Sequence, residues 1–181
     1  MKGSLIMTIK NNHLRKGNDN APLKLEVFAN VSCPGSAYLY NVAKDVFQEY
    51  IDNGQLQLVI KLWDKPREEL LPGTLIHLSL DNSKPEEAIQ TVESLLATQE
   101  EWHEFSDKEL KQLLIDKYNG QVEERLENVD VSLAITHEAI ERGVKYVPTI
   151  FLNGEEQPLD HYKFTADDIR GYIENALAKV K

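Results

Sequence analysis

The chain has 181 residues, of which 41% are hydrophobic and 28% are charged, a composition typical of one folded globular protein. Its 30 acidic and 20 basic side chains give a net charge of -10 at pH 7. A field of this sign repels phosphate backbones and anionic lipid, so we expect neither a nucleic-acid partner nor a membrane partner.

The N-terminal segment and the cysteine count predict where the protein works. The apolar run at residues 5–9 is shorter than the apolar region of a secretory signal and has no small-residue cleavage site after it. Cys33 is the only cysteine, so no disulfide can form within the chain. Both features predict a protein of the reducing cytoplasm. One cysteine cannot build a structural zinc site, and we expect no metal.

The first regular elements are a strand, a helix and a second strand. Apolar and charged residues alternate at the start of residues 23–29, which predicts a half-buried strand with Glu26 facing outward. Apolar residues at helical spacing follow over residues 39–51, and Gly54 ends that helix. Residues 56–62 form the next predicted strand. Because a helix connects the two strands, we expect them to be parallel neighbours in one sheet.

The strand signal then disappears between residues 65 and 130, where we predict three helices. Pro72 and Pro85 can each open a helix, since proline is favoured at the first helical position. Ser106 and Glu109 have the spacing of a capping box and predict the start of the third helix.

The chain returns to the sheet after a helix predicted over residues 129–142. Residues 146–152 read as a strand that contains Pro148 near its start. The pair Asn153 and Gly154 predicts a tight turn into a second strand at residues 155–159. A last helix is predicted after Thr165, which has an acidic residue at capping-box spacing.

Cys33 lies at the junction between the first predicted strand and its helix. Pro34 suits the first helical position, so Cys33 would face unpaired backbone N–H groups and the positive end of the helix dipole. These groups favour the thiolate, which is the nucleophilic form of cysteine. Gly35 adds no side chain that would obstruct a substrate. The alternative is that Cys33 is a small buried hydrophobic residue.

The order of elements and two short motifs resemble a known family. Cys33-Pro34-Gly35-Ser36 at a helix start, followed much later by Val147-Pro148-Thr149 at a strand start, is similar to the DsbA-like proteins. The resemblance implies an α/β chain with a thioredoxin fold, a central mixed sheet flanked by helices and an all-helical insertion. It divides the chain into residues 1–64 and 131–181, which form the thioredoxin-like domain, and an insertion at residues 65–130.

The resemblance also implies roles for individual residues. Cys33 matches the nucleophilic cysteine of the family, and Pro34 and Gly35 match its variable central pair. Pro148 matches the cis-proline, preceded by Val147, which offers backbone groups to a bound peptide. The dithiol members carry their second cysteine at the position of Ser36.

Without a second thiol, Cys33 cannot close an internal disulfide. The resemblance therefore implies a thiol–disulfide oxidoreductase that works by monothiol exchange, in which an external thiol resolves the mixed disulfide. The expected partners are protein thiols or disulfides, or a low-molecular-weight thiol such as glutathione as co-substrate, with no bound cofactor. Ser36 is a candidate catalytic residue whose hydroxyl would donate to the Cys33 thiolate, or it only satisfies the backbone at the helix start.

Two other functions remain open at this point. Kappa-class glutathione transferases share the fold and have serine where this chain has Ser36, although they usually have serine at the position of Cys33 as well. The third possibility is a redox-inactive module that binds peptides or acts like a chaperone, in which Cys33 is dispensable.

Overall fold

The computed structural model describes residues 13–120 and 124–180. The apolar run at residues 5–9 lies outside the described residues. Among the described residues, no helix is both long enough and apolar enough to cross a membrane. The elements, in chain order, are β1 (Leu14–Lys16), β2 (Leu23–Ala29), α2 (Pro34–Asp52), β3 (Leu56–Leu62), the 3-10 helix η1 (Glu68–Leu70), α3 (Leu71–Ser79), α4 (Pro85–Ala97), α5 (Gln99–Trp102), α6 (Asp107–Tyr118), α7 (Leu126–Glu141), β4 (Thr149–Leu152), β5 (Glu155–Gln157) and α8 (Ala166–Lys179).

The strands of the described residues form one mixed sheet in the order β1-β3-β2-β4-β5. The predicted neighbours β2 and β3 are parallel, with Leu23 opposite Leu56 and Ala29 opposite Leu62. The β4–β5 hairpin turns at Asn153 and Gly154, which both have positive φ. The antiparallel edge strand β1 was not predicted, because its three residues are too few to show a periodic pattern.

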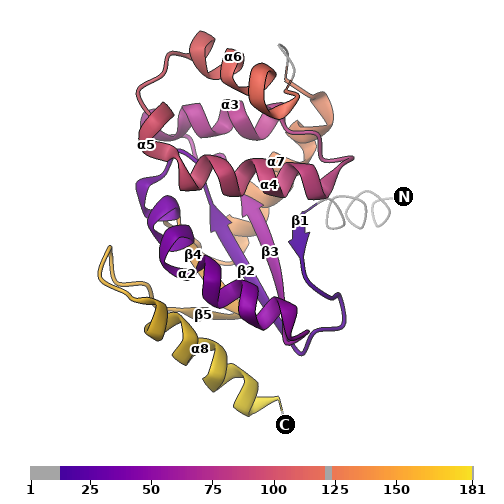
Figure 1. Ribbon diagram of the computed structural model, residues 1–181, viewed down its shortest axis with the longest axis vertical. Helices are drawn as coiled ribbons and strands as arrows, with labels where there is room; N and C mark the ends of the chain where they lie inside the picture. The colour runs from indigo at the N-terminus through magenta and orange to yellow at the C-terminus, as the bar shows by residue number, and fades with distance from the viewer. Residues whose placement is uncertain (1–12, 121–123, 181) are drawn as a thin grey trace.

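Helices cover both faces of the sheet (Figure 1). On one face, α2 and α8 pack against the central strands, and the resulting hydrophobic core extends to α4 and α6. On the other face, α7 packs on a smaller cluster that includes Phe28, Trp63 and Phe151. Strands β2 and β3 are therefore buried on both sides, as strands in the middle of a layered α/β fold are.

The helical segment contains the predicted starts at Pro85 and Ser106. Ser106 and Glu109 form a complete capping box, and so do Thr165 and Asp168 at the start of α8. The short elements η1 and α5 add to the three predicted helices, and α7 begins at Leu126, three residues before the predicted start. Helices α3 to α6 lie within residues 65–130, and the division of the chain there stays a prediction.

The prediction that Glu26 faces outward was wrong. Its side chain does point to the opposite face from Val27, but α7 covers that face and leaves Glu26 only 9% exposed. Lys61 Nζ lies 2.6 Å from a Glu26 oxygen and 2.5 Å from a Glu138 oxygen. Arg142 bonds the same two carboxylates, at 3.2 and 2.8 Å. Burial opposes ionisation, yet these cations hold the pKa of Glu26 and of Glu138 below the ordinary value.

Candidate active site at the start of helix α2

Cys33 is the N-cap residue of α2, with extended backbone angles of φ -76° and ψ 121°. Pro34 follows at the first helical position, as predicted, and the cap has no side-chain hydrogen bond. The N–H groups of Gly35 and Ser36 therefore have no intrahelical partner and point toward the open end of the helix. Cys33 itself is partly exposed, so the alternative of a buried structural cysteine does not describe it.

The cis-proline loop lies directly against Cys33. The Val147–Pro148 peptide bond is cis, as the resemblance implied. The Cys33 thiol donates to the Val147 carbonyl oxygen at an Sγ–O distance of 3.2 Å. A Cβ atom at Gly35 would lie 3.0 Å from Pro148 Cδ and 3.6 Å from Cys33 Sγ, so only glycine leaves comfortable room between the helix and this loop. The two motifs, more than 100 residues apart, thus form one site.

Ser36 is buried in the first turn of α2 and bonds the end of β2. Its side chain is buried, and its Oγ accepts a hydrogen bond from the Asn30 N–H at 3.2 Å. No hydrogen bond joins Ser36 to Cys33 in the described structure, so the expected donation to the thiolate is not seen. The alternative, a serine that satisfies the backbone, describes the geometry: the Asn30 N–H at the end of β2 would otherwise be buried without a partner.

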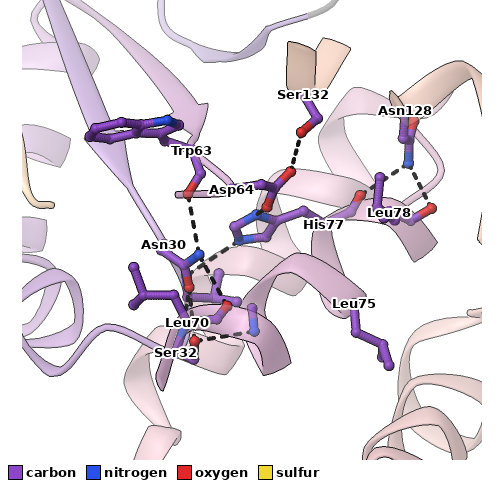
Figure 2. A network of polar contacts seen from close by, with 12 residues as sticks. Asn30, Ser32, Trp63, Asp64, Leu70, Leu75, His77, Leu78, Asn128 and Ser132 are labelled. Atoms are coloured by element: carbon purple, nitrogen blue, oxygen red, sulfur yellow. Dashed lines mark hydrogen bonds and ion pairs between the residues drawn. The ribbon is translucent and has the colours of Figure 1, made fainter. Parts of the chain in front are cut away.

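Asn30 holds the turn between β2 and α2 in place (Figure 2). It is fully buried, and its Nδ2 donates to the carbonyl oxygens of Trp63 and Leu70 at 3.2 and 3.4 Å. Its Oδ1 accepts from the Ser32 N–H and hydroxyl at 3.0 and 2.9 Å. Ser32 Oγ in turn accepts from the Gly73 N–H at 3.1 Å. The turn is therefore tied to Trp63 just after β3, to η1 and to α3.

His77 and Asp64 support the same turn from the other side (Figure 2). His77 Nδ1 lies 2.6 Å from Asp64 Oδ1, and Asp64 Oδ2 accepts from the Ser132 hydroxyl at 2.5 Å. His77 Nε2 accepts from the Val31 N–H at 3.4 Å, so Nδ1 carries the proton that is shared with Asp64. Burial would raise the pKa of Asp64, but the interactions with His77, Ser132 and Thr74 together lower that pKa below its ordinary value.

Sequence reasoning missed these supporting residues. His77 carries no sequence signal of a role at this site, yet it is only 5% exposed and bonds the N–H of Val31, two residues before Cys33. Gln99 was also missed: its Nε2 donates to the carbonyl oxygens of Val31 and Cys33 at 2.6 and 3.1 Å. Neither residue forms part of a recognisable motif. Both ring nitrogens of His77 are occupied, so it positions the turn and is not a base for the thiol.

Two grooves flank the start of α2. The cis-proline groove is lined by Cys33, the loop 146–149, part of β5 and the loop before α8, and has a cavity of about 160 Å³. The α5 groove, with a cavity of about 470 Å³, lies between α2 and the segment 96–101. Tyr38 and Tyr162 line both grooves, and their rings meet edge to face at 5.5 Å. Both grooves are open surfaces, which suits an extended chain. Within the described residues, no cluster of three or more metal-ligating side chains is found.

The sheet order, the cis-proline beside a cysteine at a helix start and the helical segment define a thioredoxin-fold protein of the DsbA-like type. A family model described as thioredoxin matches residues 10–175. The chain therefore belongs to the thioredoxin family. Among curated proteins, no match to the chain was found.

Solved structures share the fold. A conserved protein of unknown function from Enterococcus faecalis V583 is 28% identical, with 89% of each chain covered and a TM-score of 0.78. Wolbachia pipientis alpha-DsbA1 is 15% identical over 93% of this chain and 92% of its own, with a TM-score of 0.69. Proteus mirabilis ScsC in a transitional conformation is 14% identical over 98% of this chain and 78% of its own, with a TM-score of 0.74.

Proposed function

We propose that this protein is a thiol–disulfide oxidoreductase that uses Cys33 as its single nucleophile. The observation that carries the proposal is the position of Cys33, which caps α2 with its sulfur 3.2 Å from the carbonyl oxygen beside the cis-proline. Ser36 stands where a resolving thiol would be, and its Oγ accepts a hydrogen bond from the Asn30 N–H. The family resemblance supports the reaction class.

The proposed reaction has two steps of exchange. The Cys33 thiolate attacks one sulfur of a substrate disulfide, the S–S bond breaks, and the other half leaves as a thiolate that takes up a proton. Cys33 is then oxidised in a mixed disulfide, and the departed thiol is reduced. An external thiol, from a protein or a small molecule such as glutathione, then attacks the substrate sulfur of the mixed disulfide as its thiolate. The Cys33–substrate S–S bond breaks, Cys33 leaves as the thiolate, and the external thiol is left in a disulfide with that half of the substrate. A reducing cytoplasm, where we place the protein, would supply that thiol.

The test uses a small neutral disulfide. Incubation with bis(2-hydroxyethyl) disulfide should give a stable adduct of one mercaptoethanol per chain, seen by intact mass, because no second thiol releases it. Cys33→Ser should give no adduct. Added glutathione should remove the adduct from the wild type. A chain that stays unmodified would contradict the proposal and favour a redox-inactive peptide-binding module. Conjugation of electrophiles to glutathione that survives Cys33→Ser would favour a transferase.

Restoring a second thiol should change the outcome of oxidation. In Ser36→Cys, the new thiol lies one helical turn from Cys33, and we expect it to release the adduct and close an internal disulfide under mild oxidation. The reduced variant should be about 1 kcal/mol less stable, since the Asn30 N–H loses its hydroxyl acceptor. Intact mass and alkylation of free thiols measure both states. Ser79→Cys, at another buried helical serine, is the control and should keep two free thiols. Two free thiols in oxidised Ser36→Cys would contradict the prediction.

A further inference from the structure

The side chains that line the two grooves beside Cys33 carry negative charge only. Glu156 lines the cis-proline groove, and Glu100 and Glu101 line the α5 groove. Among the described residues, no lysine or arginine lines either groove. The remaining titratable side chains in the linings are those of Cys33, the tyrosines and His161. All three glutamates are exposed, and in the part of the chain that the structure describes none of them has a cationic partner.

The nearby lysine on the β3 side does not offset this charge within the grooves. Lys65 Nζ donates to the Lys145 carbonyl oxygen and lies 5.4 Å from the ring centroids of both Trp63 and Tyr146. Lys65 is therefore engaged by the Lys145 carbonyl oxygen and the two rings, and it is not among the residues that line the grooves. Lys145 and Lys163 are exposed next to the lining residues Tyr146 and Tyr162 in the chain, but neither of these lysines lines a groove.

The shape of the site indicates an extended ligand. The cavity of about 160 Å³ at the cis-proline is smaller than the roughly 300–1,000 Å³ of pockets that enclose small molecules, and the α5 groove, although about 470 Å³, is an open surface that does not enclose a ligand. The start of α2 lies between α5 and the loop before α8 (Figure 1). Tyr38 and Tyr162 line both grooves, so a chain laid over Cys33 can run from one groove into the other past these two rings. Carboxylates then lie on both sides of the reacting sulfur.

We infer that the substrate of this site is an extended protein segment whose disulfide-bonded cysteine is flanked by basic residues. The inference rests on the proposed exchange reaction and adds the class of substrate. Lysine or arginine side chains on the segment would pair with Glu100, Glu101 and Glu156, while the tyrosine rings receive its apolar parts. Anionic disulfides are disfavoured by the same carboxylates and by the net charge of -10.

The experiment compares two matched peptide disulfides. Each is the homodimer of an acetylated pentapeptide, Lys-Ala-Cys-Ala-Lys or Glu-Ala-Cys-Ala-Glu, and bis(2-hydroxyethyl) disulfide serves as the neutral compound. The rate of adduct formation at Cys33 is divided by the rate of the same disulfide with free mercaptoethanol, which removes differences in intrinsic reactivity. We expect the lysine peptide to react roughly three- to ten-fold faster than the glutamate peptide at low salt, and the ratio to fall toward one near 1 M salt.

Variants locate the source of the preference. Glu100→Gln, Glu101→Gln and Glu156→Gln together should bring the ratio of the two peptides close to one. Glu86→Gln, Glu87→Gln and Glu141→Gln change the net charge by the same amount but lie at the far end of α4 and at the end of α7, and they should keep the ratio.

The outcomes separate the two proposals. If the neutral disulfide modifies Cys33, three results would overturn the inference about the substrate. They are equal normalised rates for the two peptides, a faster reaction of the glutamate peptide, and an equal loss of the preference in both triple variants. Failure of the neutral disulfide to modify Cys33 would remove the exchange reaction itself.

Discussion

Replacing Lys61 with methionine should lower the free energy of unfolding by about 3–5 kcal/mol at pH 7. Lys61 is 3% exposed and bonds both Glu26 and Glu138 beneath α7. Methionine has similar length but no charge, so the two carboxylates would keep their bonds to Arg142 and lose the cation that lies closest to each of them. Removing one member of a buried ion cluster is costly because the charges left behind are uncompensated. Chemical denaturation with two probes measures the change.

The pH dependence of the stability loss in Lys61→Met shows whether the loss comes from the two buried carboxylates. The folded-state pKa values of Glu26 and Glu138 are depressed, so their contribution to stability is present above the ordinary carboxyl range and is lost as pH falls through the folded values. The deficit of Lys61→Met should therefore be largest near neutral pH and shrink at acid pH, where protonated glutamates need no cation.

A surface ion pair is the matched control for Lys61. Lys179 pairs with Glu155 at 2.9 Å, with both side chains 67% exposed. Lys179→Met should change stability by less than about 1 kcal/mol at any pH. A similar small effect of Lys61→Met would mean that the buried cluster is not held by its charges.

Gly73→Ala should destabilise the protein by roughly 2–4 kcal/mol, although alanine is the better helix former by about 1 kcal/mol. A Cβ atom at Gly73 would overlap Asn30 Oδ1, and it would lie 2.7 Å from Asn30 Cγ and 2.9 Å from Ser32 Oγ. Either α3 moves away from the turn or Asn30 gives up its buried hydrogen bonds. Both displace the turn that carries Cys33, so the rate of Cys33 alkylation should change as well.

Gly171→Ala is the control for this effect. Gly171 lies in α8, and a Cβ atom there meets nothing within 4 Å. The same substitution should stabilise the protein by about 0.5–1 kcal/mol and leave Cys33 alkylation unchanged. If Gly73→Ala also stabilised the protein, the close packing of α3 on the turn would be disproved.

The features that sequence predicted correctly are local. The strand–helix–strand unit follows from apolar spacing within each segment, and the two capping boxes form between residues three positions apart. The N-cap position of Cys33 follows in the same way from Pro34 beside it. The pairing of Cys33 with the loop at Pro148 came from resemblance to a family, since the two are far apart in the chain.

Tertiary structure alone decided the surroundings of Cys33. The Ser36 hydroxyl, which sequence offered to the thiolate, accepts from the Asn30 N–H because the end of β2 is buried there. The alternation of apolar and charged residues places Glu26 on the face that sequence predicts to be exposed. Helix α7, which is distant in the chain, packs on that face and buries Glu26. His77 and Gln99 reach the turn from the helical insert, 46 and 68 residues from Val31.

One physical cause separates the features that sequence predicts from those that only the tertiary structure decides. Helix starts, caps and strand periodicity depend on neighbours within a few residues, and the amino-acid order states those neighbours directly. Buried hydrogen bonds and ion pairs depend on which polar groups lose water together, and that is settled only when distant segments pack. The sequence by itself thus determined that a lone thiol caps a helix in a thioredoxin-like chain. The packing of α3, α5 and the cis-proline loop decided which groups contact that thiol and its turn, and which charged side chains line the grooves beside it.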